Sequence, residues 1–233
     1  MKGKTVLIFG GSGPLGSEVA YEFLKAGANV AVSWNTTEAW NNVRPKFDCY
    51  TSRFFEGQVD VSNEIAMNEF ATQVKEHFGS IDVMMYMAGF FHIGPMIWNT
   101  DTDVFDRMLS VNLRGAFLSA KAVLPAMLEQ KQGRIFFFPA KSVLVPQAHF
   151  GAYAVTKSGL VSLTESLAEE LKEDGITVNA IMPDAVDTYK TRKAPNATPD
   201  RWVKPVQIAE LLLAACRTES NILNGATLKV FGK

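Results

Sequence analysis

Short apolar runs alternate along the chain with longer stretches in which apolar positions recur at helical spacing. Most of the short runs are continuously apolar, which is typical of strands that are covered on both faces. They predict a parallel sheet of about seven strands. The predicted strands span residues 5–9, 29–34, 53–56, 82–87, 134–139, 177–182 and 227–231.

The longer stretches are amphipathic and predict helices between the strands. Gly27, Gly79 and Gly175 follow three of them and are typical of the residue after a helix. Pro125 predicts a kink or a boundary within the longest stretch. The predicted helices span residues 15–27, 64–79, 102–130, 153–175 and 206–216.

This β-α-β-α order predicts an α/β fold, namely one Rossmann-type, doubly wound domain over residues 1–233 with helices on both faces of the sheet. The polar segment 187–205 contains prolines and interrupts the alternation. We expect it to form a short substrate-side loop above the carboxyl edge of the sheet, where ligands bind in such folds.

The stretch GGSGPLG lies between the first predicted strand and the first predicted helix. Gly11, Gly13 and Gly16 match the pattern G-x-G-x-x-G, whose glycines let the backbone approach a pyrophosphate and let helix and strand pack closely. The amino end of the helix adds free N–H groups. A glycine-rich turn alone needs no ligand, but this context predicts a dinucleotide site at Gly10, Gly11, Ser12, Gly13, Pro14, Leu15 and Gly16.

The second predicted strand ends without an acidic residue, in the sequence SWNTTE. An aspartate there would hold a ribose 2′-hydroxyl and repel a 2′-phosphate. Its absence permits NADPH, with Asn35 and Thr36 as neutral donors, although no arginine stands beside them in the sequence. The predicted cofactor is therefore NADP or NAD, with NADP slightly favoured.

The composition narrows the range of possible partners. The chain has 233 residues and a formal net charge of −1, so no overall field would recruit nucleic acid or an anionic membrane. No apolar run approaches the roughly 20 residues that a membrane span needs. Cys49 and Cys216 are far apart and predict two buried, unpaired thiols in a reducing cytoplasm, and the histidines show no metal-binding spacing. We expect a cytoplasmic protein with a small-molecule substrate and no metal.

Tyr153 and Lys157 stand four residues apart at the start of a predicted helix, in the sequence YAVTK. Residues at this spacing share one helix face, so the lysine ammonium would lie beside the phenol. A nearby cation favours phenolate, which predicts a tyrosine pKa below its ordinary value of about 10 and a side chain able to hand a proton to a substrate. Alone, the pair would also fit a packed tyrosine and a solvated lysine.

Four motifs follow one another in an order that resembles the short-chain dehydrogenase/reductase family over nearly the whole chain: the glycine loop, Asp60 in DVS, Asn112 in SVNLRGAF, and YAVTK. The resemblance implies that Lys157 also holds the nicotinamide ribose, that Asn112 supports a water in a proton relay, and that Tyr153 is the proton donor. It implies further cofactor contacts from Asp60, Val61, Ala88, Gly89, Pro183, Val186 and Thr188.

Several positions depart from the family pattern. Tyr86 and Met87 replace two asparagines that usually tie the fourth strand to its neighbours. Pro14 replaces a glycine of the loop, at a position in the first helical turn where proline is tolerated. Asp184 stands where the family motif P-G-x-x-x-T has glycine.

Ala140 stands thirteen residues before Tyr153, where the family usually has a serine that binds a substrate carbonyl. The dihydropteridine reductase branch is similar here, because its A-K-A resembles the AKS of 140–142 and its glycine loop resembles GGSGPLGS. Its pattern D-T-x-x-x-R-K-x-P-x-A-x-x-x-x-W-x-P is also matched, by Asp187, Thr188, Arg192, Lys193, Pro195, Ala197, Trp202 and Pro205.

That resemblance implies hydride transfer to a quinonoid dihydropterin or another small conjugated imine, a reaction in which the serine matters less. Two features differ, because the branch generally has an acidic residue after the second strand and lacks VNLRGAF. A second hypothesis is reduction of a small ketone or enone, with Ser142 or a water in place of the missing serine. A third is a dinucleotide-binding sensor or assembly subunit without catalysis.

Aromatic side chains near the predicted pocket could stack on a flat substrate, although each would equally suit core or rim packing. The candidate substrate-side residues are Ala140, Ser142, Phe90, Phe91, Phe150 and Trp202. The helices that contain Asn112 and Tyr153 have more apolar positions than one sheet face needs. Family members commonly pair these helices, which implies a homo-oligomer, either a dimer or a tetramer.

Overall fold

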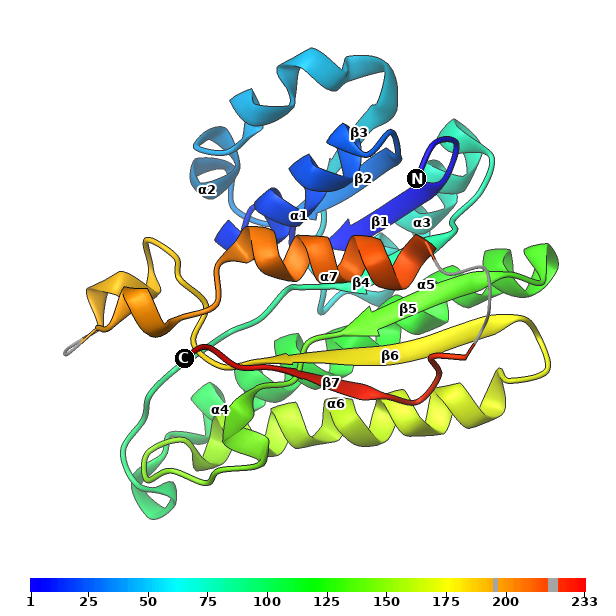
Figure 1. Cartoon of the computed structure of the whole chain (residues 1–233). Helices are drawn as coiled ribbons and strands as arrows, with labels where there is room; N and C mark the ends of the chain where they lie inside the picture. The colour runs from blue at the N-terminus through cyan, green and yellow to red at the C-terminus, as the bar shows by residue number, and fades with distance from the viewer. Residues whose placement is uncertain (195–196, 218–221) are drawn as a thin grey trace.

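The computed structural model describes residues 1–194, 197–217 and 222–233 (Figure 1). Seven parallel strands form one sheet in the order β3-β2-β1-β4-β5-β6-β7, which confirms the predicted α/β Rossmann-type fold. Every strand begins and ends within two residues of its predicted limits. The strands are β1 Thr5–Phe9, β2 Asn29–Trp34, β3 Phe54–Gln58, β4 Val83–Tyr86, β5 Gly133–Phe137, β6 Ile176–Pro183 and β7 Thr227–Val230.

The central position of β1 explains its continuously apolar sequence. Leu7 and Phe9 belong to the core on one face of the sheet, while Val6 and Ile8 belong to the core on the other. All four side chains are completely buried. Each such side chain stabilises the fold by about 1.5–3 kcal/mol, so a polar residue at any of these positions would weaken one of the two layers.

Helices cover both faces of the sheet (Figure 1). On one face lie α1 (Pro14–Lys25) and α7 (Pro205–Arg217), and on the other lie α3 (Glu64–Phe78), α5 (Gly115–Gln130) and α6 (Gly151–Glu170). In the part of the chain that the structure describes, no helix combines the length and the apolar content that crossing a membrane requires. The shorter helical elements are α2 Thr37–Asn41, α4 Thr102–Met108 and the 3-10 segments Arg44–Arg53, Ile97–Asn99, Lys141–Val143, Thr191–Lys193 and Pro199–Arg201.

The long helix predicted over 102–130 is divided, but not at Pro125. Helix α5 continues through Pro125 to its end at Gln130, so the predicted boundary there is wrong. The interruption comes earlier, where a π-helical turn (Leu109–Arg114, called the π turn below) separates α4 from α5. Wide turns of this kind are frequent at functional sites, and this one contains Asn112.

Glycine residues close two helices as predicted and a third differently. Gly79 directly follows α3 with a φ of +85°, and Gly27 lies two residues after α1 with a φ of +92°. Helix α6 ends at Glu170, five residues before Gly175, so the predicted helix over 153–175 is too long. Gly175 instead has a φ of +72° in the turn that leads into β6.

The segment predicted as a loop over 187–205 lies at the carboxyl end of β6 and is more structured than expected. Two short 3-10 segments, Thr191–Lys193 and Pro199–Arg201, interrupt it. An isolated parallel bridge pairs Val186 with Val203 and holds its two ends together. Residues 195 and 196 are outside the described part of the chain.

Candidate active site

The glycine loop connects β1 to α1 and lies against the end of β4. Gly10 has a φ of +99°, and a Cβ on it would come within 2.5 Å of the Ala88 backbone nitrogen. A Cβ on Gly16 would collide with the Gly10 carbonyl oxygen. Only glycine fits at these two positions. The close packing of helix α1 against the end of β1, which we expected of Gly16, is therefore present. The first N–H groups of α1, which begins at Pro14, lie at this turn.

The same edge of the sheet holds the other residues predicted to contact a cofactor. β1 pairs with β2 on one side and with β4 on the other, so the strand order reverses between β1 and β4. Ligands of doubly wound sheets bind in the crevice at such a point, outside the carboxyl ends of the strands. Asp60 and Val61 follow β3, and Ala88 and Gly89 follow β4, so the fold brings them to this edge.

Tyr153 and Lys157 lie on the first turns of α6. The Lys157 ammonium is 5.7 Å from the centre of the Tyr153 ring and donates a 2.9 Å hydrogen bond to the carbonyl oxygen of Phe138, just after β5. Lys157 is only 6% exposed, whereas Tyr153 is half-buried. The expected proximity of the ammonium and the phenol is therefore present.

Burial affects this pair more than the lysine charge does. It lowers the pKa of Lys157 to about 8 and raises the pKa of Tyr153 to about 12. The prediction that the tyrosine pKa falls is wrong for the polypeptide alone, because the ammonium is directed at the Phe138 carbonyl and the half-buried phenolate would lose much of its hydration. At neutral pH the phenol is protonated and most of the amine is charged.

Asn112 is completely buried in the π turn and joins three segments. Its side-chain oxygen accepts a 2.7 Å hydrogen bond from the Phe90 N–H, and its nitrogen donates to the Phe90 carbonyl at 2.9 Å and to Thr156 Oγ1 at 3.0 Å. A Cβ on Gly89 would lie 3.6 Å from the Asn112 oxygen and 3.9 Å from Lys157 Nζ. The structure therefore brings Gly89, Asn112 and Lys157 together.

The end of β2 contains a polar cluster that the sequence does not reveal. The Trp34 indole donates a 2.8 Å hydrogen bond to Glu56, whose other oxygen accepts from Arg44 at 2.7 Å. Arg44 is thus connected to Trp34 through Glu56, and it is already paired with carboxylates. Asn35 and Thr36 directly follow Trp34 and are exposed.

A compact turn follows Pro183 at the end of β6. The Val186 carbonyl accepts a 2.6 Å hydrogen bond from Thr191 Oγ1. The Thr188 N–H donates to Thr191 Oγ1 at 2.9 Å, and the two threonine hydroxyl oxygens are 2.9 Å apart. Thr191, which the motifs did not single out, therefore fixes the two residues that we expect to contact a nicotinamide amide.

Part of the pattern shared with dihydropteridine reductases has a structural explanation. Arg192 donates two hydrogen bonds to Asp187, at 2.6 and 2.8 Å, and holds the pKa of that carboxyl below its usual range. Trp202 is half-buried. Its backbone lies close to Gly232, since a Cβ on Gly232 would be 3.3 Å from the Trp202 Cα. Pro195 lies outside the described residues.

The segment that contains Ala140 is held in place by backbone and ionic contacts. The Ala140 carbonyl accepts a 3.0 Å hydrogen bond from the Val143 N–H. Lys141 forms a 2.5 Å ion pair with Asp184, which joins the segments that follow β5 and β6. The Ser142 hydroxyl oxygen is buried and has no hydrogen-bond partner among the described residues.

Of the candidate aromatic residues, Phe91 contacts the tyrosine directly. Its ring meets the Tyr153 ring edge-on at 4.9 Å between centres, and Phe150 lies 5.7 Å from Phe91. Phe90 instead packs against Arg107 of α4, whose guanidinium carbon is 4.3 Å from the ring centre. Phe91 is 53% exposed, so it forms part of the open side of the site.

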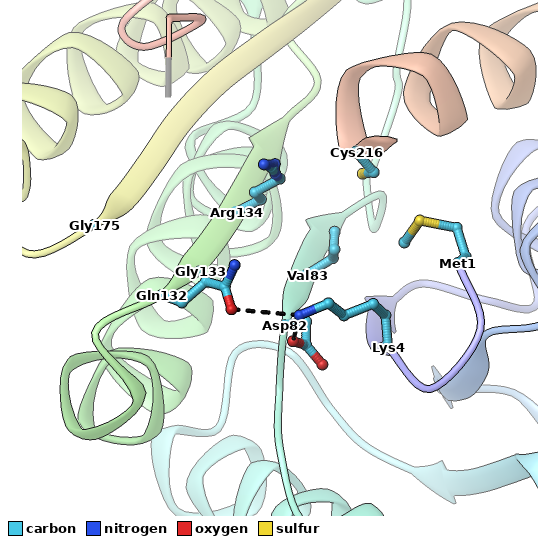
Figure 2. Close-up of a pocket in the computed structure, with 9 residues that line it drawn as sticks. All are labelled: Met1, Lys4, Asp82, Val83, Gln132, Gly133, Arg134, Gly175 and Cys216. Carbon is cyan, nitrogen blue, oxygen red and sulfur yellow. Dashed lines mark hydrogen bonds and ion pairs between the residues drawn. The ribbon is translucent and has the colours of Figure 1, made fainter. Parts of the chain in front are cut away.

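A small cavity lies at the opposite edge of the sheet, beside the amino ends of β1, β4 and β5 (Figure 2). Its polar wall is a hydrogen-bonded group in which Lys4 donates to Asp82 at 2.7 Å and to Gln132 at 3.3 Å. Cys216 also lines it, and burial raises the pKa of that thiol to about 12, which makes it a poor nucleophile. Cys49 is exposed, so the prediction that both thiols are buried is wrong. We assign no chemistry to this cavity.

Sequence reasoning did not identify several residues that shape the site. Thr156, Thr191 and Lys141 act through contacts with distant segments, and no local motif marks them. Tyr86 and Asp184 were visible in the sequence as departures from the family pattern. These departures marked the two positions as unusual, but they did not show which residues the two side chains contact.

Comparison with known proteins identifies the family to which this chain belongs. Residues 4–198 match the model of the short chain dehydrogenase family. This match spans most of the chain, so the protein belongs to that family and the resemblance seen in its motifs is confirmed. It is an enzyme of the oxidoreductase class.

Individual relatives are similar over most or all of the chain. The oxidoreductase YxjF of Bacillus subtilis strain 168, which is described as uncharacterized, is 33% identical over 197 residues, covering 82% of this chain and 74% of its own. The (2S)-[(R)-hydroxy(phenyl)methyl]succinyl-CoA dehydrogenase subunit BbsD of Thauera aromatica is 28% identical, covering 100% and 96%. The solved structure of ElxO with NADP bound superimposes with a TM-score of 0.90 at 26% identity, covering 99% and 97%.

The burial of Lys157 predicts a measurable cost to stability. Its folded-state pKa of about 8 lies below the ordinary 10.5, so the unfolded chain binds more protons between these pH values. Stability should therefore rise with pH across that window, by up to roughly 3 kcal/mol. At pH 7, Lys157→Met should raise the free energy of unfolding by about 1–3 kcal/mol, because it removes a desolvated charge and keeps the side-chain volume.

Urea unfolding at pH 7 and pH 10 tests this expectation. The advantage of the Lys157→Met variant should shrink at pH 10, where the wild-type amine is mostly neutral in the folded state. Lys172→Met is a matched control, because Lys172 is an exposed lysine just after the same helix and should change stability by less than about 0.5 kcal/mol. A Lys157→Met variant less stable than the wild type at pH 7 would contradict the proposed cost.

Proposed function

We propose that the enzyme is an NAD(P)H-dependent reductase in which Tyr153 donates a proton and Lys157 and Asn112 support it. The observation that carries the proposal is the convergence of Lys157, Asn112 and Gly89 beside Tyr153 at the ligand-binding edge. The ammonium has three N–H donors, and its hydrogen bond to Phe138 uses one of them. Ribose hydroxyls are groups that the remaining donors can bind.

The residues at the sheet edge fit a nicotinamide dinucleotide. The glycine loop allows the close backbone approach that a pyrophosphate needs, and the amino end of α1 favours its charge. The cofactor supplies a hydride when it is bound. We favour NADP over NAD, since Asn35 and Thr36 are neutral, and the NADP complex of ElxO supports this choice. Arg44 does not decide the preference, because carboxylates already hold it.

The protein's own groups then handle the proton. A Tyr153 pKa of about 12 keeps the phenol protonated at neutral pH, as a proton donor requires. Lys157 holds a charge within reach of the ring and stabilises the phenolate that forms after donation. Asn112 fixes the backbone of Phe90 and so keeps the segment after β4 in place. The water-supporting role of Asn112 stays a prediction.

The substrate is a small conjugated imine or carbonyl compound. Ala140 offers no hydroxyl to a carbonyl oxygen, which favours an imine such as a dihydropterin. The matched pattern around Asp187 and Arg192 adds less support than expected, because their ion pair explains both residues. A second candidate is a small ketone or enone, and it is favoured by the Ser142 hydroxyl, which has no partner within the described part of the chain.

The exposed side of α5 and α6 supports an assembly of copies of this chain. A hollow on this side has a mostly apolar lining, with Arg114, Ser162 and Ser166 as its polar members; the other lining residues are Leu109, Leu113, Phe117, Gly159 and Leu163. The Phe117 ring is 53% exposed, which is unusual for so large an apolar side chain. A second copy of the same face would cover it, in a dimer or a tetramer. The single domain over 1–233 and the cytoplasmic location stay predictions.

Replacing the proton donor tests the proposal most simply. Tyr153→Phe removes the acidic proton and leaves the ring, so turnover should fall about 100- to 10,000-fold while the dissociation constant for NADPH changes little. Steady-state kinetics and fluorescence titration measure the two quantities. Tyr50→Phe, at a tyrosine packed against Tyr21 of α1, should keep full turnover. NADPH binding without turnover of any imine or carbonyl by the wild type would favour the non-catalytic hypothesis.

Restoring the family serine separates the two substrate classes. Ala140→Ser should raise kcat/KM for small ketones about 10- to 150-fold, since one added hydrogen bond to a charged transition state is worth about 1.5–3 kcal/mol. It should leave reduction of a quinonoid dihydropterin nearly unchanged. Ser142→Ala is the companion variant, and loss of ketone reduction in it would show that Ser142 supplies the hydroxyl. Equal effects of Ala140→Ser on both classes would contradict the distinction.

A charged residue in the apolar hollow tests the assembly. Phe117→Asp places a carboxylate where the second copy would pack, so sedimentation velocity should show a shift from oligomer to monomer. Ile65→Asp on α3 is the control, because Ile65 is 69% exposed and does not line the hollow. A wild-type protein that sediments as a monomer at micromolar concentration would refute the proposed assembly.

A further inference from the structure

Tyr86, at the end of β4, contacts the π turn directly. Its side chain is 1% exposed, and its hydroxyl donates a short hydrogen bond to the Val111 carbonyl oxygen. This is one of the positions where the family usually has asparagine. A buried hydroxyl without a partner is costly, so the hydrogen bond fixes the distance between β4 and the π turn.

Gly115 makes this contact possible. It is buried immediately after the π turn, and a Cβ on it would collide with the Tyr86 hydroxyl oxygen and lie 3.1 Å from the Val61 carbonyl oxygen. Gly115 is in a regular helical conformation, so its backbone alone does not require glycine. The requirement comes from the tyrosine, which makes the residues at 86 and 115 depend on each other.

A chain of hydrogen bonds connects the π turn to Tyr153 in the candidate active site. Val111 precedes Asn112, whose side chain donates to Thr156 Oγ1 at 3.0 Å. Thr156 Oγ1 in turn donates to the Tyr153 carbonyl oxygen at 2.8 Å. Tyr86 is thereby connected to the backbone of Tyr153 through the π turn.

The π turn is held from other directions as well. Arg114, at its end, donates a 2.5 Å hydrogen bond to the Ser62 carbonyl in the segment after β3. Asn112 holds the Phe90 backbone after β4. Consecutive parts of the turn are thus fixed to different segments, and Tyr86 supplies the contact from inside the core.

Tyr86 does not serve as a second proton donor. Burial, together with the nearby negative charge of Asp60, raises its pKa well above the ordinary value. Its hydroxyl proton is hydrogen-bonded to the Val111 carbonyl oxygen, which is too weak a base to take up a proton at neutral pH. Its contribution is geometric.

We propose that Tyr86 is a positioning residue that, together with Gly115, sets the π turn so that Asn112 and Tyr153 are correctly placed. This inference rests on the proposed function, because it assigns Tyr86 a role in placing the proton donor. A purely structural tyrosine would affect stability and leave the turnover of the folded enzyme unchanged.

The variant Tyr86→Phe removes the hydroxyl and keeps the ring. We expect kcat to fall about tenfold with a dissociation constant for NADPH within twofold of the wild type, because small displacements of a reacting group lower rates without lowering affinity. Hydrogen exchange of the backbone amides in 109–116 should become faster. Unchanged kcat, or unchanged exchange in that segment, would overturn the inference.

A second pair of variants tests the dependence between the two positions. Gly115→Ala should lower the melting temperature and kcat, because the new methyl group meets the hydroxyl. Adding Tyr86→Phe should restore part of both losses, whereas a plain sum of the two single effects would overturn the inference. The variant Tyr153→Phe distinguishes failure of the proposed function from failure of the inference about Tyr86. If it too retains full turnover, the proposed function fails; if it is inactive while Tyr86→Phe behaves as wild type, only this inference fails.

Discussion

The carboxyl edge of the sheet is organised around one buried charge, the ammonium of Lys157. The protein removes it from water and gives it the Phe138 carbonyl as a partner, at a cost that appears as a pKa of about 8. Such an arrangement destabilises the fold unless a ligand contributes further partners. Gly89 has no side chain to occupy the space beside the ammonium, and the centre of the Tyr153 ring lies 5.7 Å from it. In the proposed function, this charge would link cofactor binding to proton transfer.

The π turn fixes the position of Asn112 near this charge. A regular helix from 102 to 130 would bring residues 111 to 114 to other positions, whereas the wider turn directs Asn112 into the core, where its side chain meets Phe90 and Thr156. The Tyr86 hydroxyl adds a contact from β4 to this turn, at a position where the family motif has asparagine.

The sequence was sufficient to predict the sheet because each strand buries both faces, and this leaves a continuous apolar run, as in β1. The glycine loop and the Tyr153–Lys157 pair are local in sequence, so their spacing also revealed them. The π turn was not predictable, because its causes are contacts with β4 and α6 that no local periodicity records. The sign of the tyrosine pKa shift was mispredicted because helical spacing indicates nearness but says nothing about burial.

The central claim is that Lys157 is a desolvated amine whose pKa lies near neutrality. NMR titration of the lysine side chains, with the Lys157→Met variant to assign the signal, measures that pKa directly. The account predicts a value of about 8 for the protein alone and a higher value once NADPH is bound, because new hydrogen-bond acceptors favour the charged form. A Lys157 signal that titrates at the ordinary value of 10.5 and does not respond to NADPH would contradict it.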